Sequence, residues 1–126
     1  MRPQRSPQET YRRVDFDARV AGADPRQLVA LCYEQLIAAL GSAIYAAASG
    51  DNALKSASLT RALAALTALQ LGISPDQALA PALTRLYTAA RRELLNSAMT
   101  FDAERIGKVR DDFRDISAAL IAGQDR

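Results

Sequence analysis

The chain of 126 residues contains no histidine and no tryptophan, and Cys32 is its only cysteine. A single cysteine cannot form a disulfide within the chain, so a disulfide-dependent secreted fold is excluded. Di-iron helical bundles use inward-facing Glu-x-x-His pairs, and haem proteins need an axial ligand such as histidine. Because the apolar helix faces described below carry neither histidine nor carboxylates, we expect no buried metal and no cofactor.

Other signals of catalysis or of targeting are missing as well. There is no glycine-rich phosphate loop, and Cys32 has no base near it in the sequence, so we interpret it as a core residue rather than a nucleophile. The 16 basic and 14 acidic residues leave a net charge of only +2, which gives little reason to expect nucleic-acid binding. Residues 1–20 lack the apolar run of a secretory signal, and no uninterrupted apolar stretch is long enough to span a bilayer. We therefore expect a cytoplasmic protein that does not insert into membranes and is not an enzyme.

The strongest positive signal is a helical pattern over residues 24–48. Asp24 can accept backbone N–H bonds as an N-cap, Pro25 suits the first helical position, and Gln27 lies three residues after the cap. Apolar residues then recur every three or four positions and cover about half of the helix circumference. Leu31 and Tyr45 fall outside even this broad face. A helix this apolar must be covered on most sides, by its own bundle, by a partner, or by both.

Three further helices follow, over about 52–71, 79–98 and 103–121. We expect Asp51 to cap the first of them and Asp102 or Thr100 to cap the last. Pro81 is placed most easily in the opening turn of the middle helix, after a separate turn at 74–78; the alternative is one kinked helix. The expected inner residues are Leu54, Ser58, Ala62, Ala65, Leu66 and Leu69, then Leu79, Leu83, Leu86, Tyr87, Ala90 and Leu94, then Ile106, Val109, Phe113, Ile116 and Leu120.

Four helices with short connections predict an all-α fold, an antiparallel four-helix bundle that forms a single domain over residues 24–123. Residues 1–23 are rich in proline and charge, and we interpret them as a mobile N-terminal arm. The apolar anchors Tyr11, Val14, Phe16 and Val20 could pin this arm onto the domain. The alternative is a disordered tail with incidental aromatics.

The first two long helices have more apolar circumference than one bundle interior needs. One interpretation is that alanine-rich faces are neutral surface without a function. The other is that they form a groove or flank for another helix, which small side chains allow to approach closely. Residues 35–50 and 62–75 are depleted in charge, which favours the second interpretation.

The ordered motifs resemble those of FliS, a family of flagellin-specific export chaperones. The run from Val20 to Glu34, VAGADPRQLVALCYE, is similar to the family signature that precedes and opens its first long helix. Gly50-Asp51 corresponds to the family's Gly-Asp between helices. Leu86-Tyr87, followed by Arg92, Leu94 and Leu95, resembles the family's LYxYMxRRLxEAN segment. Asp102, Val109 and Asp112-Phe113-Arg114-Asp115 resemble the family's closing helix. The chain departs from the family at Gly22, where the family has threonine, and at Ser97-Ala98, where the family has Ala-Asn. The family's tryptophan is absent after Ile116. The family's N-terminal tyrosine motif does not align, and Tyr11 and Phe16 are the residues nearest to it.

The resemblance implies a cytoplasmic chaperone that binds the disordered C-terminal segment of flagellin, prevents premature polymerisation and delivers flagellin to the flagellar type III export gate. In the family, the N-terminal arm can occupy part of the client surface. A non-catalytic helical adaptor that dimerises through the same flank is the alternative function, and we expect a monomer or weak homodimer. The residues expected to contact the client or the arm are Tyr11, Phe16, Val20, Leu28, Leu31, Tyr33, Ile37, Tyr45, Leu63, Leu71 and Tyr87.

Overall fold

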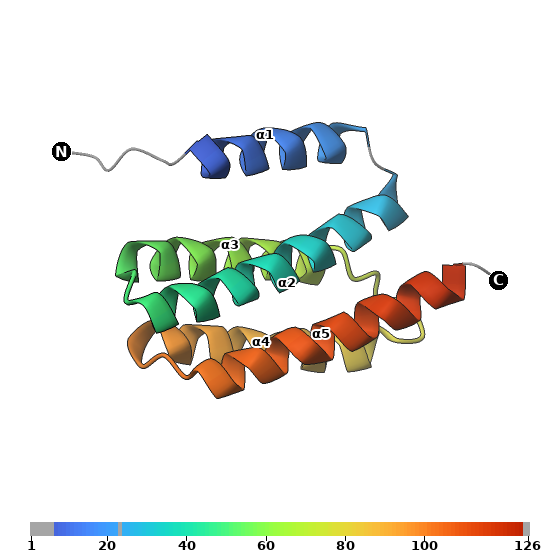
Figure 1. Ribbon diagram of the computed structural model, residues 1–126. Coiled ribbons are helices and arrows are strands. Elements are labelled where there is room, and N and C mark those ends of the chain that lie inside the picture. The colour runs from blue at the N-terminus through green and yellow to red at the C-terminus, as the bar shows by residue number, and fades with distance from the viewer. Residues whose placement is uncertain (1–6, 23, 125–126) are drawn as a thin grey trace.

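The computed structural model describes residues 7–22 and 24–124, and these residues form five α-helices and no strand. The helices are α1 (Pro7–Ala21), α2 (Pro25–Ser49), α3 (Asn52–Leu71), α4 (Ala80–Met99) and α5 (Ala103–Gln124) (Figure 1). The predicted all-α class is confirmed. Of the predicted N-terminal arm, residues 1–6 and 23 lie outside the described residues.

The ends of α2 and the start of α3 follow from local chemistry. The Asp24 carboxylate accepts the backbone N–H of Gln27 at 2.9 Å, and the Gln27 side chain accepts the backbone N–H of Asp24 at 2.9 Å, which completes a capping box. Gly50 ends α2 with a φ of 74°, a left-handed conformation that costs glycine little. Asp51 then accepts the N–H of Leu54 at 2.9 Å, so two residues are enough to reverse the chain.

The structure also decides how Pro81 is placed at the start of α4 and which residue caps α5. α4 begins at Ala80, and Pro81 lies in its first turn, where its missing N–H removes no helical hydrogen bond. Residues 74–79 form a separate turn region. At α5, Asp102 is the capping residue, because its carboxylate accepts the N–H groups of Glu104 and Arg105, each at 3.1 Å.

The core is formed by α2, α3, α4 and α5. α2 packs against α3 and α5, and α4 packs against the same two helices. Polar bonds cross two of these contacts: Ser58 to Ser42 at 2.9 Å, and Arg91 Nε to Gln70 at 2.9 Å. The largest fully buried side chains come from all four helices: Tyr33, Leu36, Leu40, Leu66, Leu94, Ile106 and Phe113.

Two residues predicted to face inward do not. Leu79 is exposed because it immediately precedes α4 as its N-terminal cap, so it does not share the buried face of that helix. Leu120 is 41% exposed and lies in the last turns of α5, near the end of the helix packing.

α2 is also the described helix that is long and apolar enough, by length and composition alone, to cross a membrane. A core helix of a folded protein passes the same test. In this structure Leu36, Leu40 and Ala43 of α2 are fully buried against the other helices, so part of its apolar surface belongs to the core.

The predicted mobile arm contains a helix. Residues 7–21 form α1, so a disordered tail is wrong for this segment. α1 contacts α2 and no other described helix. Phe16 and Val20, four residues apart on one side of α1, are partly buried, and Arg19 makes a two-bond ion pair with Glu34 of α2 at 2.8 and 2.9 Å. The arm is thus attached by one edge to α2.

Leu31 was predicted to lie outside the packed face of α2, and this is wrong, because only 6% of it is exposed. Ser42, about three helical turns later, lies on the same side of α2 and bonds to Ser58 of α3. Leu31 therefore faces α3, a direction that lies outside the apolar face predicted for α2.

We expect Leu31→Ala to lower the free energy of unfolding by about 2–4 kcal/mol, because it leaves a cavity at a buried site. Leu71→Ala is the matched control: Leu71 is exposed, so its replacement should change stability by less than about 0.5 kcal/mol. Urea unfolding of both variants measures this. Equal stability of the two variants would contradict the burial of Leu31.

Candidate functional site

Two of the predicted contact residues, Tyr33 and Tyr87, lie in the centre of the core and not on a surface. Their side chains are 1% and 3% exposed, and their hydroxyl oxygens are 2.6 Å apart. Both rings contact Phe113, with ring centroids 5.6 Å and 6.0 Å away. α2, α4 and α5 meet at this aromatic cluster. In the free protein both side chains are therefore enclosed by the core.

Burial disfavours the ionised forms of the tyrosines and of the cysteine in this interior. Burial raises the pKa of both Tyr33 and Tyr87 above the ordinary value for tyrosine, so both hydroxyls stay protonated and one donates to the other. Burial also raises the pKa of the half-buried Cys32 thiol, which disfavours the nucleophilic thiolate. Among the residues that the structure describes, no group of three or more His, Cys, Asp or Glu side chains could hold a metal ion.

We expect Tyr33→Phe alone to lower the free energy of unfolding by about 1–3 kcal/mol, because the Tyr87 hydroxyl loses its partner in the core. The double variant Tyr33→Phe/Tyr87→Phe removes both hydroxyls, so its loss should be smaller than the sum of the two single losses by at least about 0.5 kcal/mol. Urea unfolding of the four proteins in this cycle measures the coupling. Additive losses would show that the hydrogen bond does not link the two residues.

Three other predicted contact residues are strongly exposed: Tyr11 of α1 (78%), Tyr45 of α2 (69%) and Leu71 of α3 (82%). Tyr45 shares one side of α2 with Ala38, Gly41 and Ala48, which follow helical spacing. We call these four residues the α2 flank. The flank carries no charge. α1 and α2 diverge from their connected ends, so the C-terminal half of α2 lies away from α1 (Figure 1).

The remaining predicted residues are partly buried. Ile37 and Leu63 pack against the core cluster, so part of each side chain serves the fold. Leu28 lies in the first turn of α2, and Phe16 and Val20 lie on the side of α1 that carries Arg19. The structure therefore divides the eleven predicted residues into a buried group (Leu31, Tyr33 and Tyr87), an exposed group (Tyr11, Tyr45 and Leu71) and this intermediate group.

Two surface features were missed by the sequence analysis. One is the ion pair between Arg19 and Glu34, in which the hydrogen bonds from Arg19 lower the pKa of the Glu34 carboxyl. The residues lie on different helices, and no local pattern marks them as partners. The other is a pocket of about 190 Å³ between α4 and α5, whose apolar lining residues follow ordinary core periodicity in the sequence.

Comparison with known proteins finds one relationship across most of the chain. A family model described as "Flagellar protein FliS" matches residues 7–120, from the start of α1 into α5. A search of curated proteins finds no match.

Proposed function

The chain belongs to the FliS family of flagellar proteins, and from this we propose that it is a flagellar export chaperone that binds the disordered C-terminal segment of flagellin. The match over residues 7–120 is the observation that carries the proposal, because it includes α1 as well as the helices of the core. In this role the protein keeps flagellin from polymerising in the cytoplasm and delivers it to the flagellar type III export gate. No catalysis and no cofactor are involved.

The exposed apolar surface supports this proposal. A disordered segment loses conformational freedom when it folds on a partner, so it needs a long apolar surface to bind stably. The α2 flank is uncharged, and Tyr45 offers a large exposed ring with few rotatable bonds, a residue type that contributes strongly at interfaces. We place the flagellin segment along the α2 flank, with contributions from Leu71 and from the partly buried residues Leu28, Ile37 and Leu63.

α1 is suited to share this surface with the client. The buried core cluster contains residues of α2, α3, α4 and α5 and none of α1. Movement of α1 would therefore expose Phe16 and Val20 and break the pair between Arg19 and Glu34 without opening the core. We propose that α1 occupies part of the client surface in the free protein and that Tyr11, Phe16 and Val20 contact either α2 or the client.

The direct test is a calorimetric titration of the full chain with a synthetic peptide of the flagellin C-terminus. We expect one peptide to bind per chain with a negative heat-capacity change, because apolar surface is buried. Amide chemical-shift changes should fall on α1 and on the α2 flank. Absence of both heat and shift changes at micromolar concentrations would overturn the proposal. A mass that rises with concentration in sedimentation, without peptide binding, would favour the dimerising adaptor.

A further inference from the structure

Glu34 is the one acidic residue of α2, and an arginine of α1 binds it. The other charged residue of α2 is Arg26, in its first turn. Two nitrogens of the Arg19 guanidinium donate to the two oxygens of the Glu34 carboxylate, at 2.8 and 2.9 Å. A lysine ammonium cannot supply two parallel N–H groups in this way, so the geometry is specific to arginine. Glu34 is therefore a point on α2 that recognises an arginine by shape as well as by charge.

Glu34 lies on the same side of α2 as the α2 flank. It precedes Ala38 by four residues and Tyr45 by eleven, which are helical spacings. Ala30, four residues before Glu34, is exposed and continues this side toward the start of the helix. The flank from Ala38 to Ala48 is about 15 Å long, whereas this side of the helix measures about 27 Å from Ala30 to Ala48. A segment that extends along the flank toward the start of α2 therefore meets Glu34 and α1.

α1 shows which kind of helix binds beside Glu34. Phe16 and Val20 of α1 are partly buried, and Arg19 on the same side makes the ion pair. Val14, on the opposite side of α1, is 61% exposed. The pattern that binds to α2 is thus an apolar residue, an arginine three residues later, and a second apolar residue directly after the arginine.

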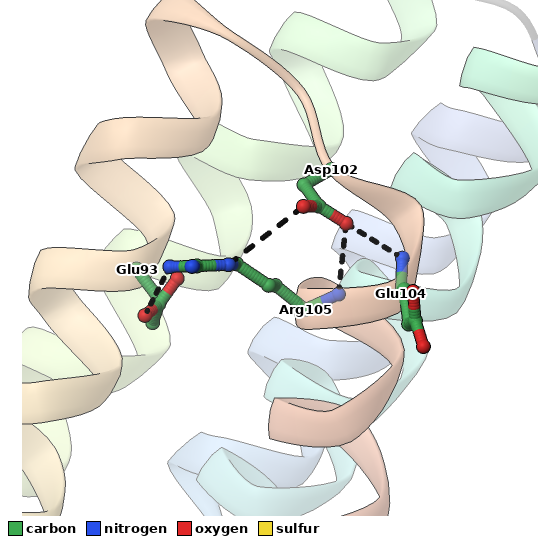
Figure 2. A network of polar contacts seen from close by, with 4 residues as sticks. All are labelled: Glu93, Asp102, Glu104 and Arg105. Atoms are coloured by element: carbon green, nitrogen blue, oxygen red, sulfur yellow. Dashed lines mark hydrogen bonds and ion pairs between the residues drawn. The ribbon is translucent and has the colours of Figure 1, made fainter.

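The pair between Arg19 and Glu34 joins a core helix to a helix outside the core. Figure 2 shows a different case, in which Arg105 of α5 reaches Glu93 of α4 with 3.4 Å between Nη1 and Oε1. α4 and α5 both contribute buried residues to the core, so these two helices stay side by side in the folded chain. α1 contributes no residue to the core cluster, and the side chains of Arg19 and Glu34 are 45% and 59% exposed. Another arginine can therefore replace Arg19 while the core stays intact.

We propose that Glu34 is a recognition site for an arginine on the partner helix that displaces α1. This inference rests on the proposed function, in which the partner is the flagellin segment, and it names the chemistry of that segment at one point. The segment presents to α2 a short helix with the pattern of α1, an arginine between two apolar residues, and continues along the α2 flank. Glu34 then selects for clients that carry an arginine at this position, because an unpaired carboxylate opposes a client without one.

The proposal gives Arg19 and Glu34 different effects on client binding, although they form one pair. Loss of the Arg19 charge weakens the attachment of α1 and leaves Glu34 available to the client, so the client competes with a less stable closed state. Loss of the Glu34 charge weakens the attachment of α1 to the same extent, but it also removes a contact of the client. An ion pair that only held α1 in place would give the same gain in affinity in both variants.

The first test compares Arg19→Gln and Glu34→Gln in the full chain. Hydrogen exchange of the α1 amides without peptide measures the release of α1 and should increase similarly in both variants. In calorimetric titration with the flagellin C-terminal peptide, we expect Arg19→Gln to bind at least about threefold more tightly than Glu34→Gln. Glu104→Gln is the matched control, because it makes the same change on α5, which α1 does not contact, and it should leave the affinity unchanged (Figure 2). Equal affinity of Arg19→Gln and Glu34→Gln would overturn the proposal.

A second probe separates this proposal from the proposed function. It is a peptide of residues 7–22, stapled between Val14 and Ala18 on the exposed side of α1, together with an Arg19→Gln copy. The receptor is the full chain with Phe16→Ser and Arg19→Gln, whose own α1 is weakly attached. We expect the arginine peptide to bind at least about threefold more tightly than its copy, and Glu34→Gln in the receptor should abolish this preference.

The outcomes of the two tests are distinct. Equal binding of the two stapled peptides, or a preference that persists in the Glu34→Gln receptor, would overturn the proposal. If the arginine preference is present and the flagellin peptide does not bind, the proposed function is wrong, and Glu34 is an arginine site for a different partner helix.

Discussion

Replacing Phe113 with alanine is expected to lower the free energy of unfolding by about 3–5 kcal/mol. Phe113 is fully buried and belongs to α5, yet its ring contacts Tyr33 of α2 and Tyr87 of α4. The substitution removes the aromatic contacts of three helices at one point and leaves a cavity that the stiff neighbouring rings fill poorly. A domain of this size has a total stability of about 5–15 kcal/mol, so a large part of it depends on this residue.

Thermal and urea unfolding measure this effect, with Met99→Ala as the control. Met99 is 91% exposed at the end of α4, and its replacement should change stability by less than about 0.5 kcal/mol. Phe113→Leu keeps most of the volume and should retain more of the stability than Phe113→Ala. A loss below about 1 kcal/mol for Phe113→Ala would contradict the aromatic cluster as the centre of the core.

Replacing Tyr45 with serine is expected to weaken binding of the flagellin C-terminal peptide by at least about tenfold, which corresponds to about 1.4 kcal/mol. Tyr45 is the largest side chain of the α2 flank, and most of it is exposed in the free protein. Aromatic residues at the centre of an interface typically account for a large share of the binding energy. Because the ring is not part of the buried core, stability should change by less than about 0.5 kcal/mol.

The control for this prediction is Leu95→Ser. Leu95 of α4 is an exposed apolar side chain outside the proposed client surface, so its replacement should leave the affinity unchanged. Calorimetric titration of both variants, after their folding is checked by circular dichroism, separates the two sites. A similar loss in both variants would indicate nonspecific hydrophobic binding. Unfolding of Tyr45→Ser would instead show that the α2 flank is part of the fold.

The resemblance to FliS could be read from the sequence because its motifs are local and ordered. The run from Val20 to Glu34 and the pair Gly50-Asp51 keep their spacing along the chain. The family match over residues 7–120 confirms the predicted family. The contact residues were harder to predict, because the same apolar period describes a side chain that packs inward and one that stays exposed for a partner.

The helix boundaries were determined by the sequence itself. Asp24, Gly50, Asp51 and Asp102 act on backbone groups within a few residues, and Pro81 excludes all but the first turn of a helix. Such interactions do not depend on the rest of the fold, so the predicted starts and ends of α2, α3 and α4 agree with the structure to within one residue.

Only the tertiary structure decided which apolar residues are buried and where α1 lies. Leu31 and Tyr33 are buried because α2 has neighbours on several sides, while Tyr45 of the same helix stays exposed. Arg19 meets Glu34 only because α1 folds back onto α2, and Arg105 meets Glu93 only because α5 packs beside α4. These outcomes depend on the positions of whole helices relative to one another, which are determined by the joint packing of side chains far apart in the sequence.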